Sequence, residues 1–163
     1  MNIIQKIIRK AIYYPMPIQL RLYLLRKTGV SIGKGSVILT GCNINVSQLT
    51  IGNDTWIGKN CYIWASTTES SSVHIGNNVM IAHLVNICCV THQVGTNQKR
   101  AGKTINKSIT IEDGCWIGTN ATILPGVTIG HGSIVAAGAL VNSDIEANSL
   151  YAGVPARKIK DLA

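Results

Sequence analysis

Residues 51–63 read IGNDTWIGKNCYI, with isoleucine at 51, 57 and 63, and this interval of six recurs through most of the chain. Between residues 51 and 159 the register has 19 positions, of which 14 are Ile or Val. It holds 12 of the 15 isoleucines in that span, and Ile32, Ile38 and Ile44 continue the interval upstream. Such a period is the sequence signature of a repeat architecture.

Two companion positions predict the shape of each six-residue unit. The residue after the aliphatic one is often glycine, and the residue four after it is small or β-branched, as at Cys61, Val85 and Ala121. Neither the spacing of an amphipathic helix nor the alternation of a two-sided strand fits this pattern. We expect one large and one small side chain per unit to point inward, with glycine relieving backbone strain at the corner. Three units then close a triangular coil, and coils stack by parallel strand pairing.

The composition favours one compact, cytoplasmic domain. The chain has 163 residues, 46% hydrophobic and 13% charged, which is too apolar for intrinsic disorder and long enough to bury a core. No apolar run reaches the roughly 18 residues of a membrane-spanning helix, and no cleavage site follows the basic N-terminus, so we expect no secretory signal. Five cysteines without a CxxC pair argue against a disulfide framework or a zinc ribbon.

The N-terminal segment, residues 1–29, differs from the repeat. Residues 1–53 hold seven Lys or Arg and no acid in a chain of net charge +8, which suggests an anionic ligand or lipid surface. Nucleic acid is not expected, because the basic residues are not interleaved with aromatics. A helix is expected over residues 18–27, where it would cap the solenoid, contact a neighbouring subunit or bind the inner face of a membrane. Residues 2–12 form another, with Lys6, Arg9 and Lys10 opposite one apolar face made of Ile3, Ile4, Ile7, Ile8 and Ile12.

The repeat domain, residues 30–160, is interrupted twice at multiples of six, so the coil is expected to resume in register. A polar stretch follows Trp64, and a longer one separates Ile87 from Ile105. We expect the second to project as a loop at residues 89–104. Excursions from a rigid solenoid often carry function, and the alternative is a tolerated surface loop.

Units such as residues 51–56 (IGNDTW) and 117–122 (IGTNAT) resemble the hexapeptide repeats of the left-handed parallel β-helix, an all-β solenoid. The handedness is implied by this resemblance alone. Residues 111–118 (IEDGCWIG), 135–141 (VAAGALV) and 151–159 (YAGVPARKI) are similar to hexapeptide acyltransferases, namely the maltose and galactoside acetyltransferases and the O-acetyltransferases of surface polysaccharide biosynthesis of the colanic acid or capsule type. The resemblance implies a homotrimer, with sites between neighbouring coils, that transfers acetyl from acetyl-CoA to a sugar hydroxyl without a metal.

In the resembling family a histidine in the projecting loop is the general base, and His92 matches that position. A sugar hydroxyl is too weak an acid to attack a thioester unaided, and imidazole titrates near neutral pH. A backbone N–H of a neighbouring coil would stabilise the oxyanion. We expect direct transfer through a ternary complex, with Cys88 and Cys89 as buried small residues rather than acyl carriers.

The resemblance also implies which residues contact acetyl-CoA. Pantetheine would lie along the groove between two coils' edges, and cationic side chains near the C-terminus would reach the phosphates. The positions that match the groove are Trp116, Thr119, Ala137 and Gly138, and Asn142 and Ser143 lie near the same end as further cofactor contacts. Arg157 matches the position that reaches the phosphates, and Lys158 and Lys160 can assist it.

The sequence restricts the class of acceptor sugar but does not identify the sugar. The resembling sugar acetyltransferases carry an acceptor-binding asparagine in the segment corresponding to residues 63–67, which here reads IWAST. We expect Trp64 to offer a platform for a sugar ring and His83 to line the same groove as His92. The departure favours a polysaccharide precursor, as a nucleotide-sugar or lipid-linked saccharide, over a simple galactoside or maltose.

Three other readings stay open. One is an N-acetyltransferase acting on an amino sugar, and another is a scaffold without activity. The third is a zinc enzyme like the γ-class carbonic anhydrase, which uses the same helix and three histidines between subunits. His74, His83 and His92 are spaced by nine residues, but the tail and the basic loop do not fit that class. Otherwise His74 and His131 are expected to be exposed.

Overall fold

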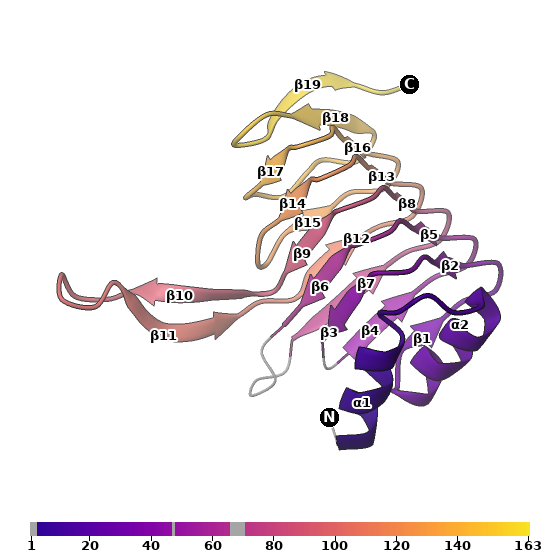
Figure 1. Ribbon diagram of the computed structural model, residues 1–163. Coiled ribbons are helices and arrows are strands. Elements are labelled where there is room, and N and C mark those ends of the chain that lie inside the picture. The colour runs from indigo at the N-terminus through magenta and orange to yellow at the C-terminus, as the bar shows by residue number, and fades with distance from the viewer. Residues whose placement is uncertain (1–2, 47, 66–70) are drawn as a thin grey trace.

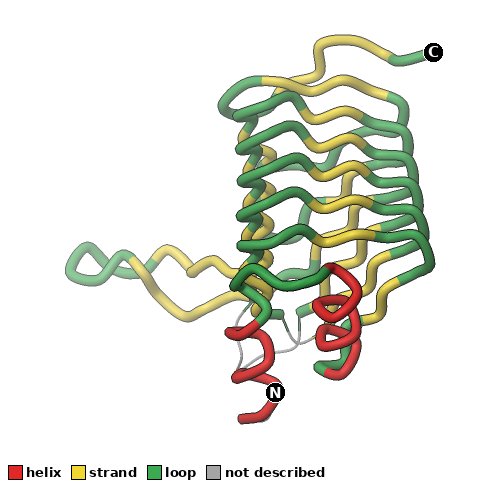
Figure 2. Tube along the Cα trace, turned by 45° about the vertical axis from the view of Figure 1, so that its right-hand side comes forward, coloured by secondary structure: helices red, strands yellow, loops and turns green. Residues whose placement is uncertain are grey.

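The six-residue interval winds the chain into a three-sided parallel β-helix, shown from two directions in Figures 1 and 2. This computed structural model describes residues 3–46, 48–65 and 71–163. The all-β solenoid with a short helical N-terminus is therefore confirmed. Most of the first expected interruption, residues 66–70, lies outside the described residues.

Each side of the prism is a sheet that takes its strands from successive coils. Side A consists of β1 (Ser31–Ile32), β4 (Gln48–Ile51), β7 (Ser72–Ile75), β12 (Ile109–Ile111) and β15 (Thr128–Ile129). Side B consists of β2 (Val37–Ile38), β5 (Trp56–Ile57), β8 (Met80–Ile81), β13 (Trp116–Ile117), β16 (Ile134–Val135), β18 (Ser149–Ala152) and β19 (Arg157–Asp161). Side C consists of β3 (Asn43–Asn45), β6 (Tyr62–Trp64), β9 (Asn86–Cys88), β14 (Thr122–Ile123) and β17 (Leu140–Val141). We call the corner between sides B and C edge BC, and the corner between sides C and A edge CA.

The core is a set of stacked isoleucine columns. On side B the strand register places Ile57 beside Ile81 and Ile81 beside Ile117, and each of the three is 0% exposed. The small residues four positions later, such as Cys61 and Ala121, are buried with them. Burying one such isoleucine contributes about 1.5–3 kcal/mol. The predicted pairing of one large and one small inward side chain is confirmed.

Two members of the isoleucine register do not point inward, so the sequence prediction was wrong for them. Ile105 lies on the strand β11 (Ala101–Asn106), half-buried and opposite Thr91. Ile159 lies on β19 and is 59% exposed. The core resumes at Ile109 and Ile111 instead. The interval cannot reveal that antiparallel strands occupy these two positions.

The glycines after the isoleucines allow close stacking and do not relieve strain, which corrects the sequence interpretation. A Cβ on Gly52 would lie 2.6 Å from the carbonyl carbon of Gly76 in the next coil. The left-handed conformation falls two residues later, as at Asp54 with φ of 53° and Asn60 with φ of 58°. Asn, Asp and Gly adopt this conformation most readily.

Two short helices close the N-terminal end of the prism (Figures 1 and 2). They are α1 (Ile3–Ala11) and α2 (Ile18–Lys27). α2 buries Leu22 and Leu25 against the first coil, so one of the three expected roles, capping, is present. No helix in the described ranges has the length and hydropathy to cross a bilayer.

The prism covers only part of the apolar face that the sequence predicts for residues 2–12. Ile8 and Ile12 pack against the core, whereas Ile4 and Ile7 are 63% and 62% exposed. Ile8 and Ile12 are four residues apart and therefore lie one above the other, on the side of the helical segment that contacts the prism.

Arg21 joins the helices to the first coil. The residue is 3% exposed, and its guanidinium donates to the carbonyls of Ile12 at 3.2 Å and Ile38 at 3.4 Å. It also donates to the carbonyls of Tyr14 and Met16. Since β2 is the terminal strand of side B, no further strand is there to pair with the Ile38 carbonyl.

Candidate active site

A long hairpin leaves the prism at edge CA and extends far beyond its sides (Figures 1 and 2). It consists of β10 (Val90–Val94) and β11, which pair antiparallel between β9 of side C and β12 of side A. The hairpin occupies the segment in which the sequence placed a projecting loop. The hairpin lies outside the prism, and its residues 91–94 on β10 are exposed and can contact other molecules.

His92 lies on β10 and is exposed. Its Nδ1 is 3.0 Å from the carbonyl oxygen of Gly102 on the opposite strand. A carbonyl only accepts hydrogen bonds, so Nδ1 carries the proton and the neutral ring has its lone pair on Nε2. This arrangement fixes the tautomer and presents Nε2 as a base.

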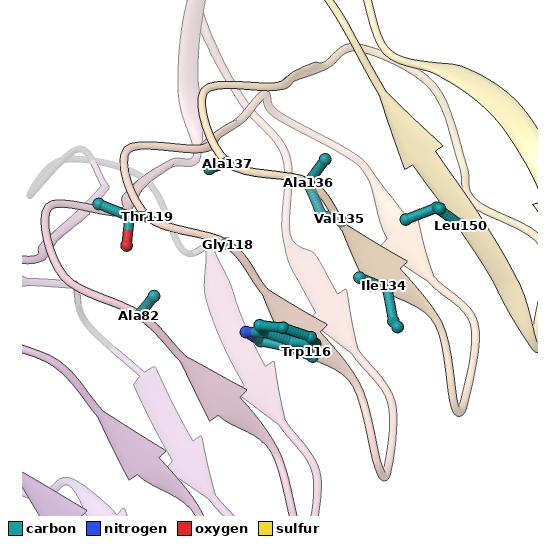
Figure 3. Close-up of a pocket in the computed structure, with 9 residues that line it drawn as sticks. All are labelled: Ala82, Trp116, Gly118, Thr119, Ile134, Val135, Ala136, Ala137 and Leu150. Carbon is teal, nitrogen blue, oxygen red and sulfur yellow. The ribbon is translucent and has the colours of Figure 1, made fainter.

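An open pocket of about 460 Å³ lies on side B and edge BC. Its lining is apolar or small: it includes Trp116, Ile134 and Leu150 from the strands, and Ala82, Gly118, Thr119, Ala136 and Ala137 from the corner. Figure 3 shows the strand side chains along one part of the pocket and the corner residues along another. The small corner residues let a slender ligand approach the backbone closely.

Two cationic side chains lie beside this pocket. β19 pairs antiparallel with β18, with Lys160 opposite Leu150 and Arg157 opposite Ala152. Residues directly opposite on paired strands project from the same face. Arg157 and Lys160 are exposed, and they therefore project on the face of side B that holds the pocket.

Lys158, expected to assist at the phosphates, is already paired with acids. Its Nζ lies 2.6 Å from Asp161 and 2.7 Å from Glu146. Hydrogen bonds to Asp161 and then Glu146 raise the pKa of Lys158 above its usual value. Its charge is therefore shared with these carboxylates.

His83 lies with the pocket and not with the hairpin. It sits at edge BC, next to Ala82, and its carbonyl accepts from the N–H of Asn120 at 3.0 Å. Its Nδ1 accepts from the N–H of Lys59 at 2.9 Å, and its ring meets Trp56 edge-to-face at 5.4 Å. The neutral ring therefore carries its proton on Nε2, the opposite tautomer to His92.

The other expected site residues lie outside the pocket lining. Trp64 is 42% exposed on β6 and pairs with Cys88, which precedes the hairpin. Asn142 is exposed after β17, at edge CA. Gly138 has φ of 69° and takes the left-handed corner position, which explains the glycine without a ligand.

The candidate residues thus form two groups on different parts of the prism. Trp116, Thr119 and Ala137 line the pocket. His92 is on the hairpin, and no hairpin residue lines that pocket. One chain therefore does not bring the candidate base to the candidate cofactor pocket.

Met80 is exposed on side B, and Ile134 and Leu150 line the pocket there, although neither the six-residue interval nor the family resemblance had marked these three residues. On side B the residue before each inward aliphatic is apolar, as at Met80, Ile134 and Leu150. On side A the corresponding residues are polar, as at Thr50 and Thr110. This contrast between sides was present in the sequence and marks side B as a surface for apolar groups.

Cys89, beside the hairpin, is buried as expected and poorly suited to carry an acyl group, whereas Cys88 is half-buried and was wrongly expected to be buried. Burial, followed by the neighbouring Cys88, raises the pKa of Cys89 to about 11. The Cys89 thiol therefore stays protonated near neutral pH, and the thiolate is the nucleophilic form.

The three histidines spaced by nine residues do not gather in one chain. His74 is on side A, His83 is at edge BC and His92 is on the hairpin. Nine residues are one and a half repeat units, so successive members fall on different parts of the coil. Within residues 3–46, 48–65 and 71–163, no group of three His, Cys, Asp or Glu side chains could hold a metal ion.

Comparison with known proteins agrees with this geometry. The family described as bacterial transferase hexapeptide (six repeats) matches residues 54–89 and 108–143. WcaF of Escherichia coli, which carries the name colanic acid biosynthesis acetyltransferase, is 32% identical over 143 residues, covering 86% of this chain and 74% of its own. The chain belongs to the hexapeptide transferase family. The left-handed β-helix implied by the resemblance is thereby confirmed as the fold of this hexapeptide transferase.

Two further relatives extend the comparison. The galactoside O-acetyltransferase of Escherichia coli is 38% identical over 113 residues, covering 68% of this hexapeptide transferase and 56% of its own length. This chain thus spans about half the length of that relative. A hexapeptide-repeat acetyltransferase from Vibrio cholerae, crystallised with acetyl coenzyme A, superposes with a TM-score of 0.83 at 29% identity, over 98% of this chain and 85% of its own.

Proposed function

We propose that this hexapeptide transferase is an acetyl-CoA-dependent O-acetyltransferase that acts on a sugar hydroxyl. The observation that carries the proposal is the pocket on side B. Trp116, Thr119 and Ala137, three positions implied by the family resemblance for acetyl-CoA, line it together. The similar protein from Vibrio cholerae was crystallised with acetyl coenzyme A.

The donor would bind along side B. The apolar strand side chains and small corner residues suit the pantetheine arm, which needs little more than a narrow apolar channel. Arg157 and Lys160 project from the same face and would pair with the phosphates through charge-assisted hydrogen bonds. The thioester would then lie on the outer face of the prism, open to an acceptor.

His92 would activate the acceptor. Nε2 takes the hydroxyl proton as the sugar oxygen attacks the thioester carbonyl, forming a tetrahedral intermediate. A backbone N–H of a neighbouring coil would stabilise its oxyanion. The intermediate then collapses, the carbon–sulfur bond breaks, and the imidazolium returns its proton to the departing CoA thiolate. The acetyl ester and free CoA are the products.

The active site would be shared between copies of the chain. The pocket and the hairpin occupy different parts of one prism, and the exposed hairpin is long enough to leave its own prism (Figure 2). A ring of identical copies would set the hairpin of one copy against side B of the next. A homotrimer is the arrangement that the family resemblance implies.

The acceptor would be a saccharide of surface polysaccharide synthesis. This part rests on WcaF and on the absence of the acceptor asparagine in residues 63–67. Trp64 would stack on a sugar ring near the hairpin, and His83 would donate from Nε2 at the pocket. The free cysteines among the described residues support a reducing, cytoplasmic location.

Filling the pocket tests the proposal. Ala137 is exposed at a corner, so Ala137→Trp adds bulk to the pocket without entering the core. We expect the affinity for acetyl-CoA, measured by calorimetry, to fall at least ~10-fold, which corresponds to about 1.4 kcal/mol. The melting temperature should stay unchanged.

His131→Trp is the matched control, because His131 holds the equivalent corner position on another edge and is exposed. Its affinity for acetyl-CoA should equal that of the unmodified protein. If the Ala137→Trp variant bound acetyl-CoA with unchanged affinity, the pocket on side B would not be the acetyl-CoA site. If the purified protein contained stoichiometric zinc and did not bind acetyl-CoA, the proposed transferase function would be wrong and a zinc enzyme would be favoured.

A further inference from the structure

The N-terminal end carries an unusual number of exposed apolar side chains. Ile4 and Ile7 are 63% and 62% exposed, although both belong to a helix that packs against the prism. We call the exposed apolar residues of α1, α2 and their connection the N-terminal surface: Ile4, Ile7, Tyr13, Tyr14, Ile18, Leu20 and Tyr23. Scattered exposed apolar residues need no explanation, but a group of them at one end of the molecule does.

Capping of the prism does not account for this surface. Ile8 on α1 and Ile12 just after it, with Leu22 and Leu25 on α2, already pack against the core. Ile4, Ile7 and Ala11 are spaced by three and four residues, so they form a second stripe on α1. The apolar side chains of α1 therefore form two stripes, and only one of these stripes packs against the prism.

The charge of this end identifies the occupant as anionic. Residues 1–53 contain no Asp or Glu, while Lys10, Arg26 and Lys27 are exposed on the two helices. The Nζ of Lys27 lies 5.4 Å from the ring centre of Tyr23, which sets an aromatic ring beside a cation. Tyrosine next to lysine is typical of the boundary between water and lipid.

We infer that the N-terminal surface docks on an anionic lipid bilayer. Ile4 and Ile7 enter the boundary between headgroups and acyl chains, and Lys10 and Lys27 pair with lipid phosphates. A second copy of the chain fits this surface less well. Two such ends in contact would bring like charges together with no acid from residues 1–53 to pair them.

This orientation stands the prism upright on the membrane. The helices lie at one end, β19 lies at the other, and the hairpin extends sideways between them (Figure 1). The pocket and the hairpin therefore remain above the lipid surface. Membrane binding does not depend on the proposed acetyl transfer, and the two are tested separately.

Vesicle sedimentation tests the inference with the full chain. We expect binding to vesicles of equal parts phosphatidylcholine and phosphatidylglycerol, and little binding to phosphatidylcholine alone. The double variant Ile4→Asp, Ile7→Asp should bind at least ~10-fold more weakly, because it removes the apolar stripe. Lys10→Glu should weaken binding by about fivefold or more, the scale of one basic side chain at an anionic surface.

Ile159→Asp is the matched control, since Ile159 is 59% exposed at the opposite end of the prism. It should bind the anionic vesicles as the unmodified chain does. The inference is overturned if the double variant binds equally well, or if both vesicle types bind alike. It is also overturned if the double variant changes the mass of the assembly by light scattering, because the surface then contacts another copy.

Discussion

Replacing His92 with alanine is expected to lower kcat for acetyl transfer about 10²–10⁴-fold, the usual loss for a general base. His92 is exposed on the hairpin and away from the core, so the fold and the affinity for acetyl-CoA should not change. The effect should therefore appear in kcat, measured as CoA released with a saturating sugar acceptor.

The His92→Asn variant tests whether His92 acts as a general base or only holds the two strands of the hairpin together. An asparagine amide can still donate toward the Gly102 carbonyl, which Nδ1 reaches at 3.0 Å, but it supplies no basic nitrogen. We expect the asparagine variant to be as inactive as the alanine variant. His74→Ala, on side A, should keep full activity. A fully active asparagine variant would mean that His92 stabilises the hairpin and does not act as the general base.

Arg21→Ala is expected to destabilise the N-terminal end of the protein strongly. It would leave the carbonyls of Ile12 and Ile38, both residues being 2% exposed or less, without this donor. Each buried polar group left unpaired costs about 1–3 kcal/mol. We expect a loss of roughly 2–6 kcal/mol, or about 10 °C in melting temperature.

Arg26→Ala is the control on the same helix. Arg26 is exposed and its guanidinium donates to the Ile32 carbonyl at 3.1 Å, so its replacement should change stability by under ~1 kcal/mol. Arg21→Lys should be intermediate, because lysine restores the charge without the planar fork. Circular dichroism gives the melting temperatures, and equal values for the Arg21→Ala and Arg26→Ala variants would contradict this account of the cap.

The sequence predicted the prism well because the physical cause of the fold is local and repeated. Each unit needs one large and one small inward residue, and Ile81 with Val85 shows the pattern as clearly in the sequence as in the core. It misassigned Ile105 and Ile159 because an isoleucine on an antiparallel strand keeps the same interval by coincidence. Strand direction is a property of long-range pairing.

Other features depend on contacts between distant segments, which a period cannot reveal. From the sequence, Arg21 is only one of several basic residues. Its role as a hydrogen-bond donor to the carbonyls of Ile12 and Ile38 becomes visible only in the folded structure. Similarly, the family resemblance implied Trp116 as a cofactor contact and His92, in the projecting loop, as the base. That these two residues lie on different parts of the prism is visible only in the folded structure.

The central claim is that the base and the cofactor pocket come from different copies of the chain. Mixing the His92→Ala and Ala137→Trp variants by joint unfolding and refolding tests it directly. With acetyl-CoA held well below its Kd for the unmodified protein, the His92→Ala variant should be nearly inactive, and the Ala137→Trp variant should keep about one tenth of the activity or less. If every site takes its hairpin from one copy and its pocket from the next, random mixing restores about one quarter of the unmodified activity, because each half is intact with a probability of one half. Activity that stays at the level of the separate variants would mean that one chain holds the whole site.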